Sequence, residues 1–289
     1  MSDARLVDAV VRAVLEQLHG REEGPCACHS APGGCCPDRF GRYVGHGADR
    51  FGLRAGVAYP REISRMIDHT LLKPEATREQ LEALCAEARD HGFATVCVNP
   101  TWVRLCSELL RGFETRVCTV VGFPLGATTT DVKAYEAART IEDGATELDM
   151  VMNVGALRSR DYAHVERDIA AVVEVGRRGG AIVKVIIEAA LLDDDEKVKA
   201  CVVAKAACAD FVKTSTGFGP GGATVADIAL MRRVVGPEMG VKAAGGVRDL
   251  KSAQALIDAG ADRIGASVGV KIVQESRGQK PAAAGGTGY

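Results

Sequence analysis

Charged side chains interrupt four short apolar runs of this sequence, one charge near the middle or end of each run. A lysine or carboxylate inside an apolar strand is costly to bury unless another group compensates for its charge. Four such groups in runs that follow one another along the chain indicate either a buried ion-pair network or a reactive site. The four residues are Asp149, Lys184, Lys213 and Lys242.

Lysines that are grouped in this way suit Schiff-base chemistry. An amine must be unprotonated to attack a carbonyl carbon, and free lysine has a pKa of about 10.4. Burial and a neighbouring cation both lower that pKa, and we expect Lys213 and Lys242 to repel one another in this way. Asp149 can then transfer protons through water as the imine and enamine form. The alternative interpretation is a purely structural ion-pair network.

The runs alternate with helical patterns from about residue 60 onward, which predicts repeated β-α units. Apolar residues fill both faces of the runs, as in parallel strands that are covered by helices. Eight units favour a closed (β/α)8 TIM barrel. The predicted strands are Met66–Leu71, Ala94–Val98, Arg116–Val121, Glu147–Met152, Ile182–Ile187, Asp210–Thr214, Val241–Ala244 and Asp262–Ala266. The predicted helices are Thr77–Asp90, Thr129–Glu142, Asp161–Arg177, Asp193–Cys208, Thr224–Val234 and Asp249–Ala259, several of which begin with a Thr or Asp suited to an N-cap.

Glycine-rich turns follow the last three predicted strands, at the end of the barrel where active sites lie. Glycines let backbone N–H groups approach phosphate oxygens closely, and helix N-termini add a favourable dipole. One Gly-Gly pair would be an ordinary turn, but three such turns on consecutive loops predict a phosphate site. The turns are Lys213–Gly219, Ala243–Arg248 and Gly265–Ser267.

At these residues the chain resembles the deoxyribose-phosphate aldolase family, from about residue 60 to residue 275. The motifs that carry the resemblance are Ile67–Leu72, Gly122–Gly126, Glu147–Val151, Lys184–Glu188, Phe211–Gly217 and Lys242–Arg248. The resemblance implies a class I aldolase that needs no cofactor. Its reaction would be the reversible cleavage of 2-deoxyribose 5-phosphate into acetaldehyde and glyceraldehyde 3-phosphate.

The resemblance implies a role for each matching residue. Lys213 would form the Schiff base, Asp149 and Lys242 would donate and accept protons, and Lys184 would tune the electrostatics of the site. The phosphate would bind at Gly217, Gly245, Gly246 and Ser267. The sugar side of the pocket would be lined by Asp68, Thr70 and Asn99.

Two positions depart from part of the family, and other functions stay open. Some members have a lysine where this chain has Phe218, and some have a second serine where it has Val268, so phosphate affinity is in question. A class I aldolase for another sugar phosphate is the nearest alternative. A phosphate-binding isomerase or lyase without a covalent lysine is the second, and a non-catalytic scaffold is the third.

The chain outside the predicted barrel divides into three segments. Residues 1–19 include an amphipathic helix at 3–19 that resembles the encapsulation peptides of bacterial microcompartment enzymes, although it could also pack on the barrel. Residues 20–58 read as a flexible linker rich in cysteine and glycine, before a barrel domain predicted at 59–275. Residues 276–289 are predicted to be disordered. The linker holds candidate metal ligands whose spacing lacks a paired C-x-x-C motif: Cys26, Cys28, His29, Cys35 and Cys36.

Composition limits the partners of this 289-residue chain. The apolar fraction is 47% and the net charge is −2, so nucleic acid and anionic lipid are poor candidates. With no predicted leader or membrane span, the expected location is the cytoplasm, or the interior of a microcompartment if residues 3–19 bind shell proteins. We expect a homo-oligomer, with a dimer favoured, that binds a small sugar phosphate and acetaldehyde.

Overall fold

A computed structural model describes residues 62–279 of the chain; residues 1–61 and 280–289 are not described. The predicted N-terminal helix, the linker with its cysteines and most of the predicted disordered tail lie outside the described residues. The prediction of disorder is wrong for Ser276, the first residue of the segment 276–289. Helix α11 (Gly269–Ser276) includes this residue, because Val270, Ile272 and Val273 pack into the core.

Eight parallel strands form a closed barrel in which each strand pairs with the next and β8 returns to β1. This confirms the predicted TIM barrel. The strands are β1 Ile67–Leu71, β2 Thr95–Val98, β3 Arg116–Val121, β4 Glu147–Val151, β5 Ile182–Ile186, β6 Phe211–Lys213, β7 Gly240–Ala244 and β8 Arg263–Ala266. Every predicted strand is present, and its ends differ from the prediction by one residue at most.

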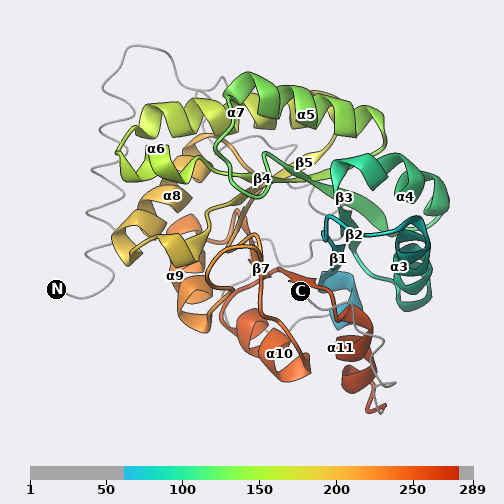
Figure 1. The fold of residues 1–289 in the computed structure, drawn as a ribbon. Coiled ribbons are helices and arrows are strands. Elements are labelled where there is room, and N and C mark those ends of the chain that lie inside the picture. Colours follow the sequence, from blue (N-terminus) through green and yellow to red (C-terminus); the bar gives the residue numbers. More distant parts are fainter. Residues whose placement is uncertain (1–61, 280–289) are drawn as a thin grey trace.

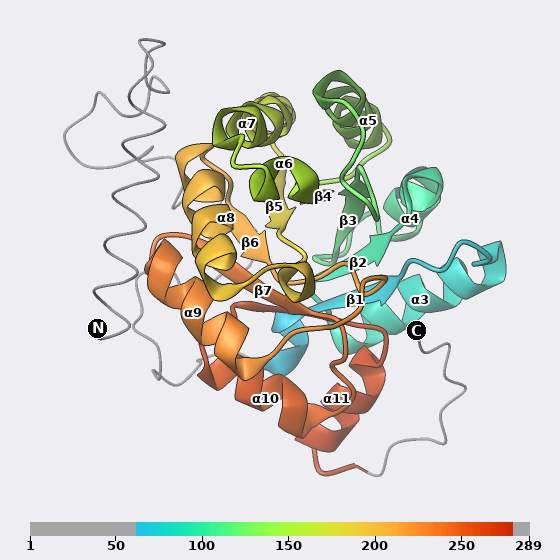
Figure 2. The same cartoon turned by 60° about the vertical axis from the view of Figure 1, so that its left-hand side comes forward.

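Helices surround the strands on all sides, as Figures 1 and 2 show. They are α3 Arg78–His91, α4 Val103–Leu109, α5 Thr130–Glu142, α6 Val154–Arg158, α7 Tyr162–Gly179, α8 Asp194–Ala206, α9 Val225–Val235, α10 Leu250–Asp258 and α11 Gly269–Ser276, with short 3-10 turns at η1 Ile63–Met66, η2 Pro100–Trp102 and η3 Ala189–Leu191. None of the described helices is both long enough and apolar enough to span a bilayer.

Side-chain caps explain where several helices begin. Thr77 and Gln80 form a capping box at α3, and Asp193 and Glu196 form another at α8. These caps satisfy backbone N–H groups that have no partner within the helix. Thr129 is an exception, because it precedes α5 without a side-chain cap.

The main apolar core lies between the strands and the surrounding helices, and the barrel interior differs from it. The core joins outward strand residues such as Val183 and Val212 to helix residues such as Ile169. Inside the barrel, a small apolar cluster formed by Leu72, Cys97, Cys118 and Val120 lies beside buried charged groups. The barrel interior is therefore the region to search for chemistry.

Candidate active site

Asp149 is the centre of a buried ion-pair network inside the barrel. Its Oδ2 accepts hydrogen bonds from the Nζ atoms of Lys213 and Lys242, each at 2.7 Å, and its Oδ1 accepts one from Lys184 at 2.8 Å. Asp149 and Lys184 are fully buried, and the side chains of Lys213 and Lys242 are 3% and 1% exposed. The structure thus brings together all four of the predicted catalytic residues.

A second layer of charges extends the network toward β8 and β1. Lys184 contacts Glu147 at 2.6 Å, and Lys242 contacts Asp68 at 2.5 Å. Arg263 closes the layer, because its Nη1 lies 2.7 Å from Asp68 and 3.2 Å from Glu147. Among the described residues, the whole network holds the cations Lys184, Lys213, Lys242 and Arg263 and the carboxylates Asp68, Glu147 and Asp149.

Strand register explains why these side chains meet. Asp149 on β4 pairs with Lys184 on β5, and Lys213 on β6 pairs with Lys242 on β7. In a closed barrel, inward-pointing residues from alternate strands fill the interior in layers. Here polar residues occupy positions that are usually aliphatic, so the interior stays charged and enclosed.

The ion pairs of the network determine the charges of Asp149 and Lys242. Burial opposes ionisation of Asp149, but the charges of Lys184, Lys213 and Lys242 outweigh it and hold the pKa of this carboxyl well below its usual value. Burial likewise opposes the charge on Lys242, yet Asp149 and Asp68 raise its pKa above the usual value. Asp149 is therefore an anion and Lys242 a cation at neutral pH.

This arrangement differs from the direct lysine–lysine repulsion that the sequence predicts. Lys213 and Lys242 contact the same oxygen of Asp149, so an anion is shared by the two amines. A proton can therefore pass between either amine and Asp149 without an intervening water.

Cysteine thiols lie against the same carboxylate. Cys118 Sγ is 3.2 Å from Asp149 Oδ1 and 3.3 Å from Lys184 Nζ, and Cys97 pairs with Cys118 across β2 and β3. Burial, followed by the contact with Cys97, raises the pKa of Cys118 well above its usual value, so it is a neutral thiol that can donate to Asp149. Cys97, Cys118 and Asp149 could together reach one metal ion, but here the carboxylate already serves three amines.

The predicted phosphate glycines occupy turns with left-handed backbone. Gly217, Gly245 and Gly246 have φ values of 89°, 84° and 77°, which glycine adopts without strain. The turns after β6 and β7 pack closely, because Ala223 N donates to the carbonyl oxygens of Ala244 and Gly245. Ser267 follows β8, the strand next to β7.

The residues predicted to line the sugar side divide between two environments. Asp68 is fully buried in the charge network, where it pairs with Lys242 and Arg263. Thr70 is buried and donates to the Asp68 carbonyl, whereas Asn99 is half-buried and donates to the Leu72 carbonyl at 3.0 Å. Their roles toward a substrate stay predictions.

Sequence reasoning gave no role to four residues of this region: Glu147, Arg263, Cys118 and Glu188. Glu147 and Glu188 do lie in the quoted motifs, but Glu147 begins an apolar run and Glu188 follows one, and a carboxylate at either boundary is usually solvent-exposed. Arg263 follows Asp262 at the start of a run, which also suggests exposure. The available signal was a charged side chain at the first position of a strand, as in Glu147 and Arg263.

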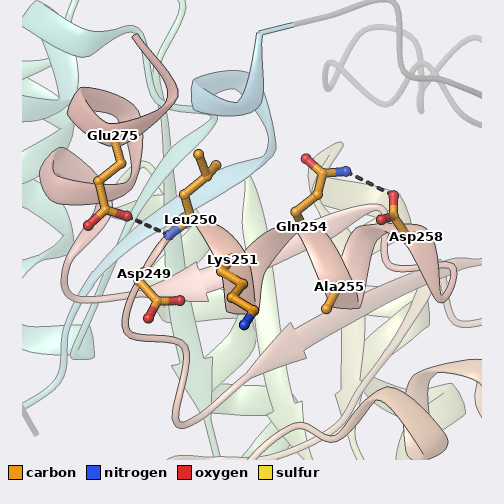
Figure 3. Close-up of a pocket in the computed structure, with 7 residues that line it drawn as sticks. All are labelled: Asp249, Leu250, Lys251, Gln254, Ala255, Asp258 and Glu275. Carbon is orange, nitrogen blue, oxygen red and sulfur yellow. Dashed lines mark hydrogen bonds between the residues drawn. The ribbon is translucent and has the colours of Figure 1, made fainter. Parts of the chain in front are cut away.

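A separate hollow of about 700 Å³ lies outside the barrel, along α10 (Figure 3). Its polar side chains form hydrogen bonds within and between the helices that line it. Glu275 accepts from Leu250 N at 2.8 Å, and Asp258 accepts from Gln254 at 2.9 Å. None of the four interior charges of the predicted catalytic set lines it, so this hollow is separate from the charge network.

Comparison with known proteins identifies the family of this chain. Residues 63–275 match the model of the DeoC/LacD family of aldolases. The deoxyribose-phosphate aldolase of Lysinibacillus sphaericus is 62% identical over 213 residues, which are 74% of this chain and 95% of that protein. A solved structure of a putative deoxyribose-phosphate aldolase from Coccidioides immitis has a TM-score of 0.74 at 38% identity, over 96% of this chain and 100% of that one.

A further solved relative, the deoxyribose phosphate aldolase of Aeropyrum pernix, is described as a unique tetramer. It has a TM-score of 0.71 at 36% identity and covers 82% of this chain and 97% of its own. The family match extends over most of the chain and includes every strand of the barrel. This chain belongs to the DeoC/LacD family of aldolases.

Proposed function

We propose that this chain is a class I deoxyribose-phosphate aldolase that cleaves 2-deoxyribose 5-phosphate reversibly to acetaldehyde and glyceraldehyde 3-phosphate. The observation that carries the proposal is one buried carboxylate, Asp149, in direct contact with two lysine amines on adjacent strands. Relatives of this chain that are named deoxyribose-phosphate aldolase support this choice of substrate.

Lys213 is the nucleophile in this proposal. Its amine attacks C1 of the open-chain sugar, and the carbinolamine loses water to give a protonated imine. Loss of the proton from the C3 hydroxyl then breaks the C2–C3 bond, which releases glyceraldehyde 3-phosphate and leaves an enamine. Protonation of the enamine at C2 and hydrolysis of the new imine release acetaldehyde and restore the amine. Asp149 and Lys242 donate and accept these protons.

Ion-pair geometry favours Lys213 over its neighbours as the nucleophile. Lys184 and Lys242 each contact two carboxylates within 3 Å, whereas the described residues give Lys213 only Asp149. The network also holds four basic side chains and three carboxylates, and an excess buried charge is costly. Attack by the Lys213 amine therefore breaks the fewest ion pairs.

The phosphate would bind to backbone N–H groups at Gly217, Gly245, Gly246 and Ser267. The contact between the turns after β6 and β7 supports a single phosphate site there. Thr70 and Asn99 would contact the sugar, and Asp68 would orient Lys242 from within the network.

Borohydride trapping tests the proposal together with product analysis. Purified protein is incubated with 2-deoxyribose 5-phosphate, reduced, digested and analysed by mass spectrometry, while acetaldehyde release is followed in parallel. We expect a reduced adduct on Lys213 and both products in equal amounts. Lys213→Met should lose the adduct and the activity, and Lys251→Met, on the exposed face of α10, should keep both.

The same experiment separates the alternatives. Turnover without an adduct would indicate an isomerase or lyase that does not use a covalent lysine. An adduct with a different aldehyde product would indicate a class I aldolase for another sugar phosphate. The absence of both an adduct and turnover would indicate a non-catalytic scaffold.

We further propose that the chain forms a homo-oligomer, with a dimer favoured. Apolar side chains exposed around the loop after β3 support self-association, since Leu125 and Tyr135 are 77% and 73% exposed. Sedimentation of the purified protein tests this, and a monomer at micromolar concentration would contradict it.

Targeting to a microcompartment is proposed from the sequence of residues 3–19 alone, and the cytoplasmic location is likewise proposed from the sequence. Residues 1–20 fused to a fluorescent protein should co-purify with shell proteins if the segment is an encapsulation peptide. Metal analysis of the purified full chain tests the cysteine cluster at residues 26–36.

A further inference from the structure

Glu188 is a buried carboxylate that the mechanism above does not use. It follows β5 and is only 4% exposed. Its backbone has φ 51° and ψ 62°, in the left-handed region that is costly for a residue with a side chain. Strained backbone of this kind persists where the surrounding structure imposes it, commonly beside functional sites.

The Glu188 side chain holds the turn after β6. Its Oε2 accepts hydrogen bonds from the backbone N–H of Thr216, at 3.2 Å, and from the Thr216 hydroxyl. Thr216 Oγ1 in turn accepts from Phe218 N at 3.0 Å. A hydroxyl has one hydrogen and two lone pairs, so Thr216 Oγ1 can donate to Glu188 and accept from Phe218 at the same time.

Backbone bonds on either side of Glu188 join the same two segments. Ile187 N donates to the carbonyl of Lys213 at 3.0 Å, and Ala189 N donates to the carbonyl of Thr214 at 2.8 Å. The left-handed turn at Glu188 lies between these two bonds. The segment after β5 is thus hydrogen-bonded to the segment that carries both Lys213 and the glycine turn.

These bonds place the N–H of Gly217 between two amides that are already hydrogen-bonded. The N–H groups of Thr216 and Phe218 are taken by Glu188 and Thr216, and the N–H of Gly217 lies between them. Space around the carboxylate is also restricted, because a Cβ at position 219 would lie 2.9 Å from Glu188 Oε1. Glycine at 219 therefore allows the carboxylate to approach the turn.

We propose that Glu188 is a positioning residue, which acts through Thr216 to aim the Gly217 N–H at the phosphate of the substrate. The Glu188–Thr216 contact thereby sets the preference for a phosphorylated over an unphosphorylated sugar. This inference rests on the proposed function, since it takes the phosphate to bind at the turn after β6.

The test compares two substrates, 2-deoxyribose 5-phosphate and unphosphorylated 2-deoxyribose, with a matched pair of variants. Thr216→Val removes the hydroxyl and keeps the volume, whereas Thr216→Ser keeps the hydroxyl. We expect Thr216→Val to raise KM for the phosphorylated sugar by about tenfold, the effect of one charge-assisted hydrogen bond, and to lower kcat/KM for 2-deoxyribose much less. Thr216→Ser should restore most of the difference.

Inorganic phosphate gives a second measurement, as an inhibitor of 2-deoxyribose cleavage. Its inhibition constant should rise in Thr216→Val by about the same factor as KM for the phosphorylated sugar. An equal loss on both substrates, or Thr216→Ser as damaging as Thr216→Val, would overturn the inference. If Thr216→Val does not fold, Glu188→Gln replaces it, because it removes the charge but keeps a carbonyl acceptor; it should show the same asymmetry between substrates.

The wild-type protein separates the two possible failures. A wild type that does not cleave 2-deoxyribose 5-phosphate refutes the proposed function itself. A wild type that cleaves it, with variants that affect both sugars alike, refutes only the role of Glu188.

Discussion

Replacement of Asp149 by asparagine removes the anion on which the lysine network depends, with almost no change in volume. Asp149 contacts the amines of Lys184, Lys213 and Lys242 at 2.7 to 2.8 Å and is fully buried. Without it, the three lysines and Arg263 would have only Asp68 and Glu147 as carboxylate partners within the network. We expect the variant to be less stable and almost inactive.

The magnitudes follow from the burial and from the number of partners. Removal of one partner from a buried ion pair costs about 3–5 kcal/mol, because a charge is left uncompensated. Release of a proton from one amine would reduce that cost, so we expect a loss near the lower end of the range. Loss of a positioned proton-transfer group lowers the rate by about 10²–10⁴-fold.

Asp168→Asn is the matched control, because it removes another buried carboxylate that is not part of the ion-pair network of Asp149. Asp168 is 1% exposed and pairs with the buried Lys133 at 2.5 Å, between α7 and α5. Urea unfolding gives stability, and acetaldehyde release at 25 °C gives activity. Asp168→Asn should lose stability but keep most of its activity per folded molecule. An Asp149→Asn variant that retains activity within a few-fold of wild type would refute the role of Asp149.

Three further predictions concern stability and the environment of Asp149. Folding lowers the pKa of Asp149, so this carboxylate stabilises the protein above pH 3.8, its usual pKa, and the stabilisation is lost as the pH falls toward the lower pKa of the folded state. Urea unfolding measured from about pH 7 downward should therefore show a free energy of unfolding that decreases with pH, and Asp149→Asn should show a smaller decrease. Cys118→Val removes the thiol donor to Asp149 Oδ1 and should cost about 1 kcal/mol in unfolding free energy and lower kcat a few-fold, with Cys118→Ser less affected. Gly126→Ala should lower the free energy of unfolding by about 1–3 kcal/mol or more, measured in urea, because φ is 66° and the new Cβ would lie 2.1 Å from the Met152 carbonyl oxygen.

The fold could be predicted from the sequence because its signals are local. Apolar runs that are buried on both faces, such as Ile182–Ile186, indicate parallel strands between helix layers. The capping residues Thr77, Asp193 and Asp249 mark helix starts to within one residue. The short helix α4 was not identified, because seven residues are too few to show a helical period.

The site could be predicted only in part because closure of the barrel is not a local property. Lys213, Lys242, Lys184 and Asp149 are conspicuous as charges within apolar runs. Arg263 is not, because its partners Asp68 and Glu147 lie 195 and 116 residues away along the chain. Only the pairing of β8 with β1 brings Arg263 beside Asp68, and the direct contacts of Lys213 and Lys242 with one oxygen of Asp149 depend on the same geometry.

Arg263 tests whether charge balance makes Lys213 nucleophilic, because it contributes a cation to the network through contacts with Asp68 and Glu147. In Arg263→Met the network loses one positive charge, while Asp68 keeps Lys242 and Glu147 keeps Lys184. We expect this variant to form less adduct with Lys213 than the wild type, measured by borohydride trapping at pH 7. Arg263→Lys keeps the charge and should retain the wild-type amount. If both variants trap as much adduct as the wild type, then contacts around Lys213, and not the net charge of the network, control its reactivity.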